Sequence, residues 1–323
     1  MKKYKYSLEQ YSSQSVHKCP DCGEKSFTRY VDNQTGVYIS DDVGMCNRAN
    51  KCAYAYSPKE YFIDNDIPFD TNYKNDYTNE DTQEDDLPPS FIPIEFVEES
   101  CEGSILERNH PIPHNMFIRF LFGQFKFAAE RAINQYFIGS AEHWPGATVF
   151  WQIDKDGNVR CGKVMLYDQN GKRVKKPYDH IHWVHKILHL PDFNLKQCLF
   201  GEHLLTDDDK RPVAICESEK SAIIASMYLP EFIWLACGGL TLLNAQKCEV
   251  LKGRDVCLFP DLGGYEKWKS KARTLSHITR FQVSDLIENH ATVEDRKKGL
   301  DIADYLIQFD HLEFILWEPE NDS

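Results

Sequence analysis

Short apolar runs alternate with helical patterns over the C-terminal third of the chain. Three runs, PVAIC (212–216), FIWLA (232–236) and DVCLF (255–259), have the length and continuity of buried strands. The segments SEKSAIIASMYL and GYEKWKSKARTLS, which follow the first and third runs, have helical periodicity. Further on, ITRFQV predicts another strand and LDIADYLIQF a terminal helix. This alternation predicts a mainly parallel sheet with helices packed on its faces.

The middle of the chain has a different pattern. Residues 116–136 carry apolar positions at helical spacing and predict one or two helices. Residues 147–153 (ATVFWQI) and 159–167 (VRCGKVMLY) predict two strands, joined by the turn signal DKDGN. We therefore expect an α+β part ahead of the parallel sheet.

Most of the negative charge lies in one segment. The net charge is −13, and residues 64–102, with thirteen acidic residues and one lysine, carry −12 of it. Residues 64–93 are acidic, rich in Asn and Thr and weakly apolar, which is typical of a chain that stays unfolded. An acidic arm that folds back on a basic groove is the alternative. Residues 154–190 sum to +4, so the overall acidity does not exclude a nucleic-acid partner.

Four of the eleven cysteines stand in two close pairs near the N-terminus. Two residues separate Cys19 from Cys22, five separate Cys46 from Cys52, and 23 lie between the pairs. Four such thiolates suit tetrahedral zinc, which would supply folding energy that so small a module cannot gain from its core. The role of this zinc ribbon is open between structural stapling and contact with single-stranded DNA. The cations and aromatic residues that suit the second role are Arg29, Tyr30, Arg48, Lys51, Tyr54 and Tyr56.

Two carboxylates follow predicted strands. Glu217 comes directly after VAIC, and Asp261 comes after VCLF and a proline. In neighbouring parallel strands both would emerge at one edge of the sheet, where two carboxylates can hold Mg²⁺ beside a triphosphate or phosphodiester. Lys220 and Ser221 lie in the first turn of the next helix, where free N–H groups attract phosphate.

The alternative is that each carboxylate at a helix start is only a cap. It explains Asp301, which would share one helix face with Asp304, about as well as catalysis does. It explains Asp261 less well, because Pro260 and two glycines mark a tight turn beside it.

Residues 212–262 resemble the Toprim domain of primases, topoisomerases and related nucleases. The resemblance lies in PVAICESEKSAIIAS, WLACGG and GRDVCLFPDLGGYEKW. Toprim domains carry a glutamate after their first strand, which in primases serves as a metal ligand or acid–base group, and Glu217 stands there. They also carry an Asp-x-Asp pair, of which Asp261 matches the first member, whereas Gly263 replaces the second. Asp301 resembles a further acidic position of primase-type Toprim domains. The resemblance implies that Glu217, Asp261 and Asp301 are catalytic, with Mg²⁺ or Mn²⁺ as cofactor.

The segment VFWQIDKDGNVRCGKVMLYDQNGKRVKKP, with CLFGEHLL later, resembles the basic subdomain that precedes Toprim in bacterial primases. That subdomain lies beside the catalytic centre and helps to form the groove for template and nucleotide. A solvated hairpin surface is the alternative for each of its cations. The cations that would bind phosphate, in salt-sensitive contacts, are Lys163, Lys172, Arg173, Lys175 and Lys176.

These segments predict an α/β protein with four parts. They are a zinc β-ribbon (1–63), an acidic flexible linker (64–93), a primase-like basic α+β subdomain (94–210) and a Toprim-like domain with a parallel sheet and flanking helices (211–323). The combination is similar to DnaG-type primases and to the primase-like replication proteins of bacterial mobile elements and phages.

The resemblance implies a primase that joins nucleotides on single-stranded DNA. A catalytically degenerate Toprim protein that binds DNA or nucleotide is the alternative, and Gly263 favours it; a Toprim nuclease is the weaker one. The chain has no G-x-x-x-x-G-K-[ST] motif, so we expect any helicase to be a separate partner. The start MKKYKYSLEQYSSQSV lacks the apolar region of a signal peptide, and no apolar stretch has the length of a membrane span. We therefore expect a cytoplasmic protein with no membrane partner.

The remaining His and Cys residues are expected to have ordinary roles. A second metal site among His180, His182, His185 and His189 is conceivable, but surface or groove histidines are the favoured interpretation. Cys216, Cys237 and Cys257 are expected to be buried as small apolar residues.

Overall fold

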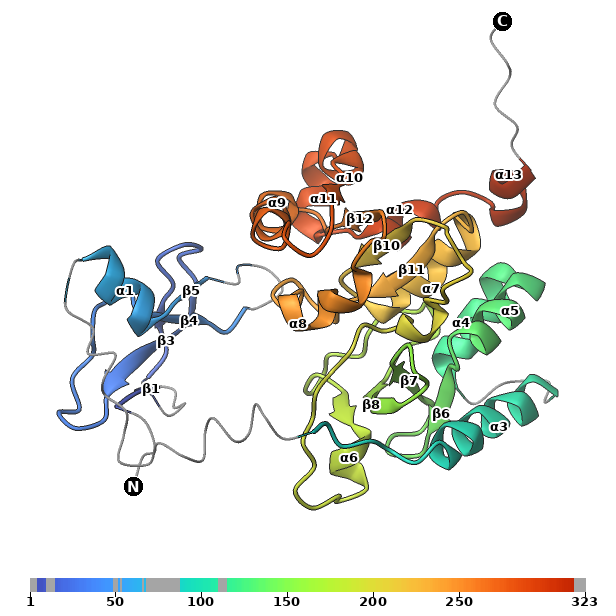
Figure 1. The fold of residues 1–323 in the computed structure, drawn as a ribbon, viewed down its shortest axis with the longest axis horizontal. Helices are drawn as coiled ribbons and strands as arrows, with labels where there is room; N and C mark the ends of the chain where they lie inside the picture. The colour runs from blue at the N-terminus through green and yellow to red at the C-terminus, as the bar shows by residue number, and fades with distance from the viewer. Residues whose placement is uncertain are drawn as a thin grey trace, which may run out of the picture. The chain divides into compact units, whose positions relative to one another are not determined.

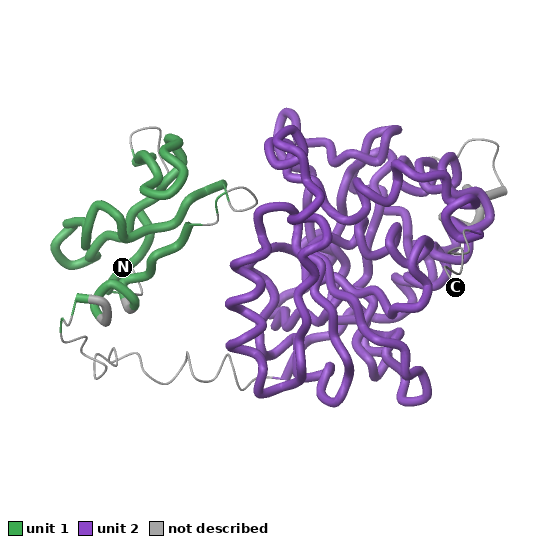
Figure 2. Tube along the Cα trace, turned by 90° about the horizontal axis from the view of Figure 1, so that it is seen from above, with its two compact units in different colours: residues 1–87 green, residues 88–323 purple. Residues whose placement is uncertain are grey.

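The structure is a computed structural model that describes residues 5–9, 15–48, 52, 54–65, 67, 88–109 and 115–316. The chain divides into two compact units, residues 1–87 and 88–323 (Figure 2). The finer boundaries expected at 63/64, 93/94 and 210/211 stay predictions. Most of the expected linker lies outside the described residues. Its last part, 88–93, instead packs on the second unit, because Ile92 is buried and bridges to Val159.

The first unit is an antiparallel ribbon with a small core. Phe27, which is fully buried, contributes to this core together with Cys19, Cys46 and Cys52. The central strand is β3 (Lys25–Asp32), which pairs with β1 (Tyr6–Leu8), β2 (His17–Lys18) and β4 (Gly44–Cys46); β4 also pairs with β5 (Ala55–Tyr56), and α1 (Pro58–Asp64) follows.

The second unit begins with helices and an antiparallel sheet (Figure 1). The helices are α3 (Glu95–Asn109), α4 (Met116–Phe125) and α5 (Phe127–Gln135); the sheet order is β6 (Gly139–Ala141), β7 (Ala147–Ile153), β8 (Val159–Met165), β9 (Ile181–Trp183), and α6 (Val184–Ile187) follows. Strands β7 and β8 match the two predicted strands. The helical pattern over 116–136 forms two helices because Lys126, with φ of 48°, redirects the chain between them.

The parallel sheet predicted from the sequence is present. Its order is β11 (Ile233–Ala236), β10 (Val213–Cys216), β12 (Val256–Phe259), β13 (Phe281–Val283), and all pairs are parallel. The predicted helices after the first and third strands are α7 (Glu219–Tyr228) and α9 (Tyr265–Thr274). Short helical turns lie at η1 (Glu202–Leu204), α8 (Ala245–Cys248) and η2 (Glu249–Leu251).

Both faces of the parallel sheet are covered. Val213 and Ile215 of β10 belong to a cluster that includes Trp268 of α9. Ala214 and Cys216 face the opposite cluster, which contains side chains of α4, α5, α7 and α12 (Ile302–Leu306). The second cluster also includes Phe150 and Tyr167, so the antiparallel and parallel parts share one core. This arrangement confirms the α/β fold class.

The C-terminal region has more helices than the sequence predicted. Besides α12, it contains α10 (Leu286–His290), α11 (Val293–Lys298) and α13 (His311–Leu316). Helix α11 buries no side chain, so it has no apolar stripe to predict it; its ends are set by a Thr292–Asp295 capping box and by Gly299. In the described part of the chain, no helix is both long and apolar enough to span a membrane.

Candidate functional site

Strand register places Glu217 and Asp261 side by side. Strands β10 and β12 are parallel neighbours in which Cys216 pairs with Phe259, so the chain leaves both strands at one edge. The backbone N–H of Asp261 donates to Oε1 of Glu217 at 3.2 Å. The Glu217 carboxylate therefore contacts the Asp261 backbone at the carboxyl edge of the sheet, where ligands bind in folds of this type, and the charges of the two side chains interact.

Asp301 reaches the same region from the start of α12. Its Oδ2 accepts a hydrogen bond from Ser221 Oγ at 2.7 Å, and its Oδ1 accepts from the N–H of Asp304 at 2.9 Å. Ser221 lies in the first turn of α7, shortly after Glu217, so this contact ties α12 to the end of β10. Asp301 therefore caps helix α12, which was one of the two roles considered from the sequence. It also lies next to the predicted site.

The acidic edge, defined here as Glu217, Asp261, Asp301 and Asp304, concentrates negative charge in a place where Glu217 is buried and the three aspartates are half-buried. Burial raises the pKa of Glu217 to about 7; the Asp261 N–H and Lys267 oppose this rise, and Asp301 adds to it. Burial, with the charges of Glu217, Asp301 and Asp304, raises the pKa of Asp261 well above its ordinary value. Burial and Asp301 likewise raise the pKa of Asp304. Each charge therefore disfavours the others, and a bound cation would relieve the repulsion.

The chemistry of the acidic edge fits a hard divalent cation. Oδ1 of Asp261 is buried and has no hydrogen-bond partner among the described residues. Oxygen ligands and one or two carboxylates are what Mg²⁺ uses when waters and substrate phosphates complete its shell. The edge is not a closed cage: within the described residues, only four cysteines form a group of three or more His, Cys, Asp or Glu ligands whose donor atoms all lie within 4.8 Å. Glu217 and Asp261 are the residues that would hold the cation.

Two glycines shape the turn after Asp261. Gly264 packs so closely that an added Cβ would lie 2.9 Å from the Asp261 carbonyl oxygen and 3.3 Å from Glu217 Oε1. Gly263, at the position where the sequence resemblance leads one to expect a second aspartate, has φ of +86°, although an added Cβ there would meet no atom within 4 Å. Space for a side chain therefore exists at Gly263, but the backbone favours glycine.

Three of the predicted cations lie beside the acidic edge. The charge of Arg173 lowers the pKa of Asp261, and Lys220 and Lys172 lower that of Asp304, in each case against the larger effect of burial. Lys172 is exposed, whereas Arg173 and Lys220 are half-buried. Lys175 and Lys176 are also exposed, on the same segment as Lys172, so they can meet a phosphate from solvent.

Two predicted phosphate-binding residues have internal partners instead. The ammonium of Lys163 donates to both carboxylate oxygens of Glu219 at 3.0 Å, and the two side chains are 11% and 2% exposed. Ser221 is fully buried, and its hydroxyl contacts Asp301 and Ser218. Lys163 was expected to line a groove for template and nucleotide. In the structure its side chain instead points into the shared core, because β8 packs inside that core.

Glu219 and Lys267 are two site residues that were not predicted from the sequence. Glu219 neutralises Lys163, and the charge of Lys267, on α9, lowers the pKa of Glu217 against the effect of burial. A signal for the first pair exists, since Lys163 interrupts the strand pattern VRCGKVMLY and Glu219 begins a strongly apolar helix. Pairing them requires knowledge of how β8 packs on α7.

The four predicted zinc ligands converge in the first unit. Their sulfur atoms all lie within 4.8 Å, with 3.6 Å between Cys19 and Cys52 and 3.9 Å between Cys22 and Cys46. Tetrahedral zinc with bonds of about 2.3 Å requires sulfur separations of about 3.8 Å. Burial raises the pKa of Cys19 and Cys52, whereas the Glu24 backbone N–H lowers that of Cys22 to about 7. The quartet fits structural Zn²⁺, whose charge would stabilise the buried thiolates.

The cations of the ribbon have local partners. Arg29 pairs with Asp41 at 2.9 Å, and Arg48 pairs with Glu24 at 3.7 Å. Tyr54 donates to the Asp42 carbonyl at 3.1 Å. Lys51 lies outside the described residues. These contacts favour a structural role for the ribbon and leave its predicted DNA contact as a prediction.

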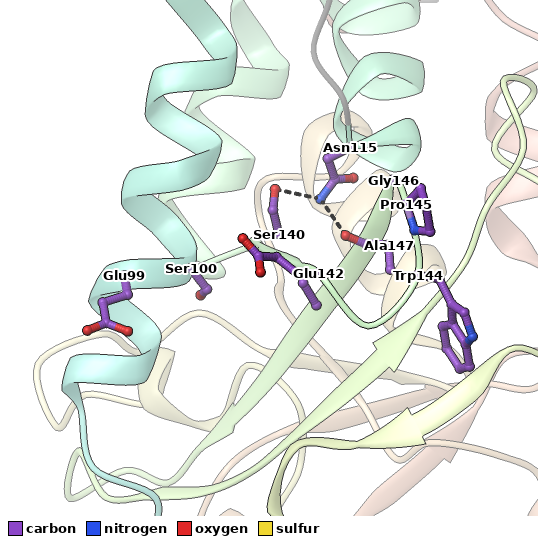
Figure 3. Close-up of a pocket in the computed structure, with 10 residues that line it drawn as sticks. Glu99, Ser100, Asn115, Ser140, Glu142, Trp144, Pro145, Gly146 and Ala147 are labelled. Atoms are coloured by element: carbon purple, nitrogen blue, oxygen red, sulfur yellow. Dashed lines mark hydrogen bonds between the residues drawn. The ribbon is translucent and has the colours of Figure 1, made fainter. Parts of the chain in front are cut away.

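A pocket of about 420 Å³ lies elsewhere on the second unit, between α3 and the turn from β6 to β7 (Figure 3). Ser140, Glu142 and Trp144 line it. The amide of Asn115 donates to Ser140 Oγ at 3.2 Å and to the Ala147 carbonyl at 3.4 Å. These bonds fix both ends of the turn that carries Trp144.

Two family models match parts of the chain. Residues 4–67 match a zinc beta-ribbon finger, in agreement with the cysteine quartet. Residues 115–262 match a domain of unknown function (DUF6371). No curated protein matches the chain.

Several solved structures are similar to this chain. The Aquifex aeolicus primase, with its zinc-binding and RNA polymerase domains, is 13% identical, with coverage of 96% of this chain and 79% of that chain and a TM-score of 0.40. The DnaG catalytic core is 12% identical (66% and 83% covered, TM-score 0.36). The primase fragment of the bacteriophage T7 primase-helicase is 13% identical (53% and 70% covered, TM-score 0.33).

Proposed function

We propose that this protein is a primase-like nucleotidyltransferase that acts on single-stranded DNA at the acidic edge. The observation that carries the proposal is the meeting of Glu217 and Asp261 at the carboxyl edge of two parallel strands, with Asp301 beside them. A buried group of carboxylates with raised pKa values is typical of a functional site. Single-stranded DNA, nucleotides and a separate helicase are the proposed partners.

The residues around the edge suit the handling of a nucleotide. Without a bound cation the pKa of Glu217 is about 7, so this carboxyl group can exchange a proton near neutral pH; as a ligand of Mg²⁺ it would stay ionised instead. Lys172, Arg173 and Lys220 supply positive charge beside the carboxylates and can position phosphate groups. Mg²⁺ or Mn²⁺, when bound by Glu217 and Asp261, would neutralise charge that develops on the phosphate oxygens.

Primer synthesis on a single-stranded circle, with labelled ribo- and deoxynucleotides and Mg²⁺ or Mn²⁺, tests this proposal. We expect short labelled products from the wild-type protein and loss of at least about a hundredfold in Glu217→Gln and Asp261→Asn, because removal of a transition-state charge contact typically has an effect of this size. Glu266→Gln is the matched control, since Glu266 lies on the surface of α9 and pairs with Lys269, whose side chain is also partly exposed. Products that persist in both site variants would refute the role of the acidic edge.

A binding protein without catalysis is the second candidate, and Gly263 favours it. The turn lacks the second Toprim carboxylate, and its backbone conformation suits glycine. In that case folded wild-type protein would bind the DNA circle and form no product. Shortening of labelled DNA would point instead to the nuclease.

A further inference from the structure

Five aromatic rings form an unbroken row on the antiparallel sheet. Tyr178 stacks on His180 with centroids 4.5 Å apart, and His180 meets Trp144 edge-on at 5.1 Å. Trp144 contacts His143 at 4.4 Å, and His143 stacks on His182 at 4.8 Å. We call these five residues the ring row.

Strand register explains why residues distant in the sequence form the ring row. Ala147 of β7 follows the turn that carries His143 and Trp144, and the next residue, Thr148, pairs with Met165 of β8. Met165 in turn pairs with Ile181 of β9. The turn between β6 and β7 therefore lies at the same end of the sheet as residues 178–182.

The ring row faces solvent but has a fixed base. Tyr178 is 56% exposed, His143 is exposed, and the other three rings are half-buried. Trp144 packs against the core cluster of β7 and β8 and lines the pocket in Figure 3. Burial, together with His143 and Lys186, lowers the pKa of His182, which favours its neutral form. Tyr178 and His143 are the two exposed rings of the row, so their faces are available to stack on a ligand.

Cations flank the ring row on the same chain segment. Lys175 and Lys176 precede Tyr178 and are exposed, and Lys186 follows His182; Asp179 and Glu142 are the exposed acidic neighbours in sequence. The segment that carries these lysines begins with Lys172 and Arg173, which lie beside the acidic edge. One continuous segment thus joins phosphate-binding charge at the acidic edge to aromatic faces at the ring row.

We infer that the ring row stacks the bases of single-stranded DNA and guides the strand toward the acidic edge; this rests on the proposed function for the identity of the strand. Aromatic faces with adjacent cations bind single strands without sequence preference, because every base has a π-face and every nucleotide a phosphate. A protein partner would instead favour a broad apolar patch, and this row is narrow and mostly imidazole and phenol.

Binding of a fluorescent oligothymidylate, measured by anisotropy without nucleotides or added Mg²⁺, tests the inference. Tyr178→Ala and His143→Ala should each bind about tenfold more weakly, since one base–aromatic stack is lost. Phe127→Ala is the control for a general loss of surface aromatics, because Phe127 is 89% exposed on α5. It should bind like the wild type. Trp144→Phe should keep most of the affinity, because it preserves a ring at the base of the row.

An abasic oligonucleotide of the same length separates stacking from charge. It keeps the phosphates but has no bases, so it should bind the wild type and both ring variants equally. Equal binding of oligothymidylate by wild type, Tyr178→Ala and His143→Ala would overturn the inference, as would an equal loss with both oligonucleotides. DNA binding that depends on the rings in a protein without synthesis would overturn the proposed function and leave the ring row intact. Primer synthesis by a protein whose DNA binding does not depend on these rings would overturn the ring-row inference and leave the proposed function intact.

Discussion

The ammonium of Lys163 lies 3.0 Å from both carboxylate oxygens of Glu219 in the interior of the second unit. Lys163 belongs to β8 of the antiparallel sheet, and Glu219 begins α7, two residues after Glu217. This ion pair therefore connects the basic part of the molecule to the helix that starts at the acidic edge. The pair is buried, and Glu219 lies two residues from Glu217 in the chain.

Breaking this buried pair should be strongly destabilising. Glu219→Leu alone leaves a buried ammonium without a partner, and we expect the free energy of unfolding to fall by about 3–5 kcal/mol. The double variant Lys163→Met/Glu219→Leu should recover most of the loss, since no unpaired charge remains. Urea denaturation measures both. The exposed pair Lys269–Glu266, 3.8 Å apart, is the control, and its loss should change stability by less than about 1 kcal/mol. A Glu219→Leu effect as small as the control would contradict this account.

The raised pKa of Glu217 makes stability depend on pH. The folded protein holds this proton up to about pH 7, whereas the unfolded chain releases it near 4.5. The stabilising contribution is therefore complete below pH 4.5 and is lost as pH rises through 7, a change of about 3 kcal/mol. Glu217→Gln should lack this loss, so without added Mg²⁺ its stability relative to wild type should rise between pH 5 and 8. Thermal or urea unfolding over that range measures the difference, and a constant difference would count against a raised pKa.

Zinc should be structural in the ribbon. We expect about one zinc per chain, because four thiolates fill one tetrahedral site. Cys22→Ser should lose zinc and unfold the first unit, whereas Cys257→Ser, a half-buried residue of β12, should retain the metal. Both variants are purified without chelators. Metal analysis then measures their zinc content, and circular dichroism measures whether the first unit is folded. Full zinc content in Cys22→Ser would remove this cysteine from the ligand set.

The two glycines after Asp261 should respond differently to alanine. In Gly264→Ala the new Cβ would press on the Asp261 carbonyl at 2.9 Å, so Asp261 or Glu217 must shift and primer synthesis should fall at least about tenfold. Gly263→Ala has open space but an unfavourable φ, so it should lose about 1 kcal/mol of stability with a smaller effect on synthesis. Urea denaturation and the primer assay give the two readouts. A larger loss of primer synthesis in Gly263→Ala than in Gly264→Ala would show that close packing at Gly264 does not shape the site.

The sequence predicted what depends on local pattern. Apolar runs and turn signals located β7, β8 and the parallel strands, and cysteine spacing located the zinc quartet. The pairing of Glu217 with Asp261 followed because parallel neighbours end at one edge. Helix α11 was missed because its ends depend on capping and it buries no side chain. The Lys163–Glu219 pair and the ring row could not be predicted because their members are distant in the chain, and only the packing of β8 and the register of β6 to β9 bring them together.

Binding of Mn²⁺ at the acidic edge is the most direct test of the central claim. Electron paramagnetic resonance of free Mn²⁺, titrated with zinc-loaded protein, reports the affinity without requiring activity, and Mn²⁺ competes poorly with zinc for thiolates. We expect Mn²⁺ binding in the wild type and in Glu266→Gln, and a loss of affinity of at least about tenfold in Glu217→Gln and Asp261→Asn. Equal Mn²⁺ affinity in all four proteins would contradict the central claim.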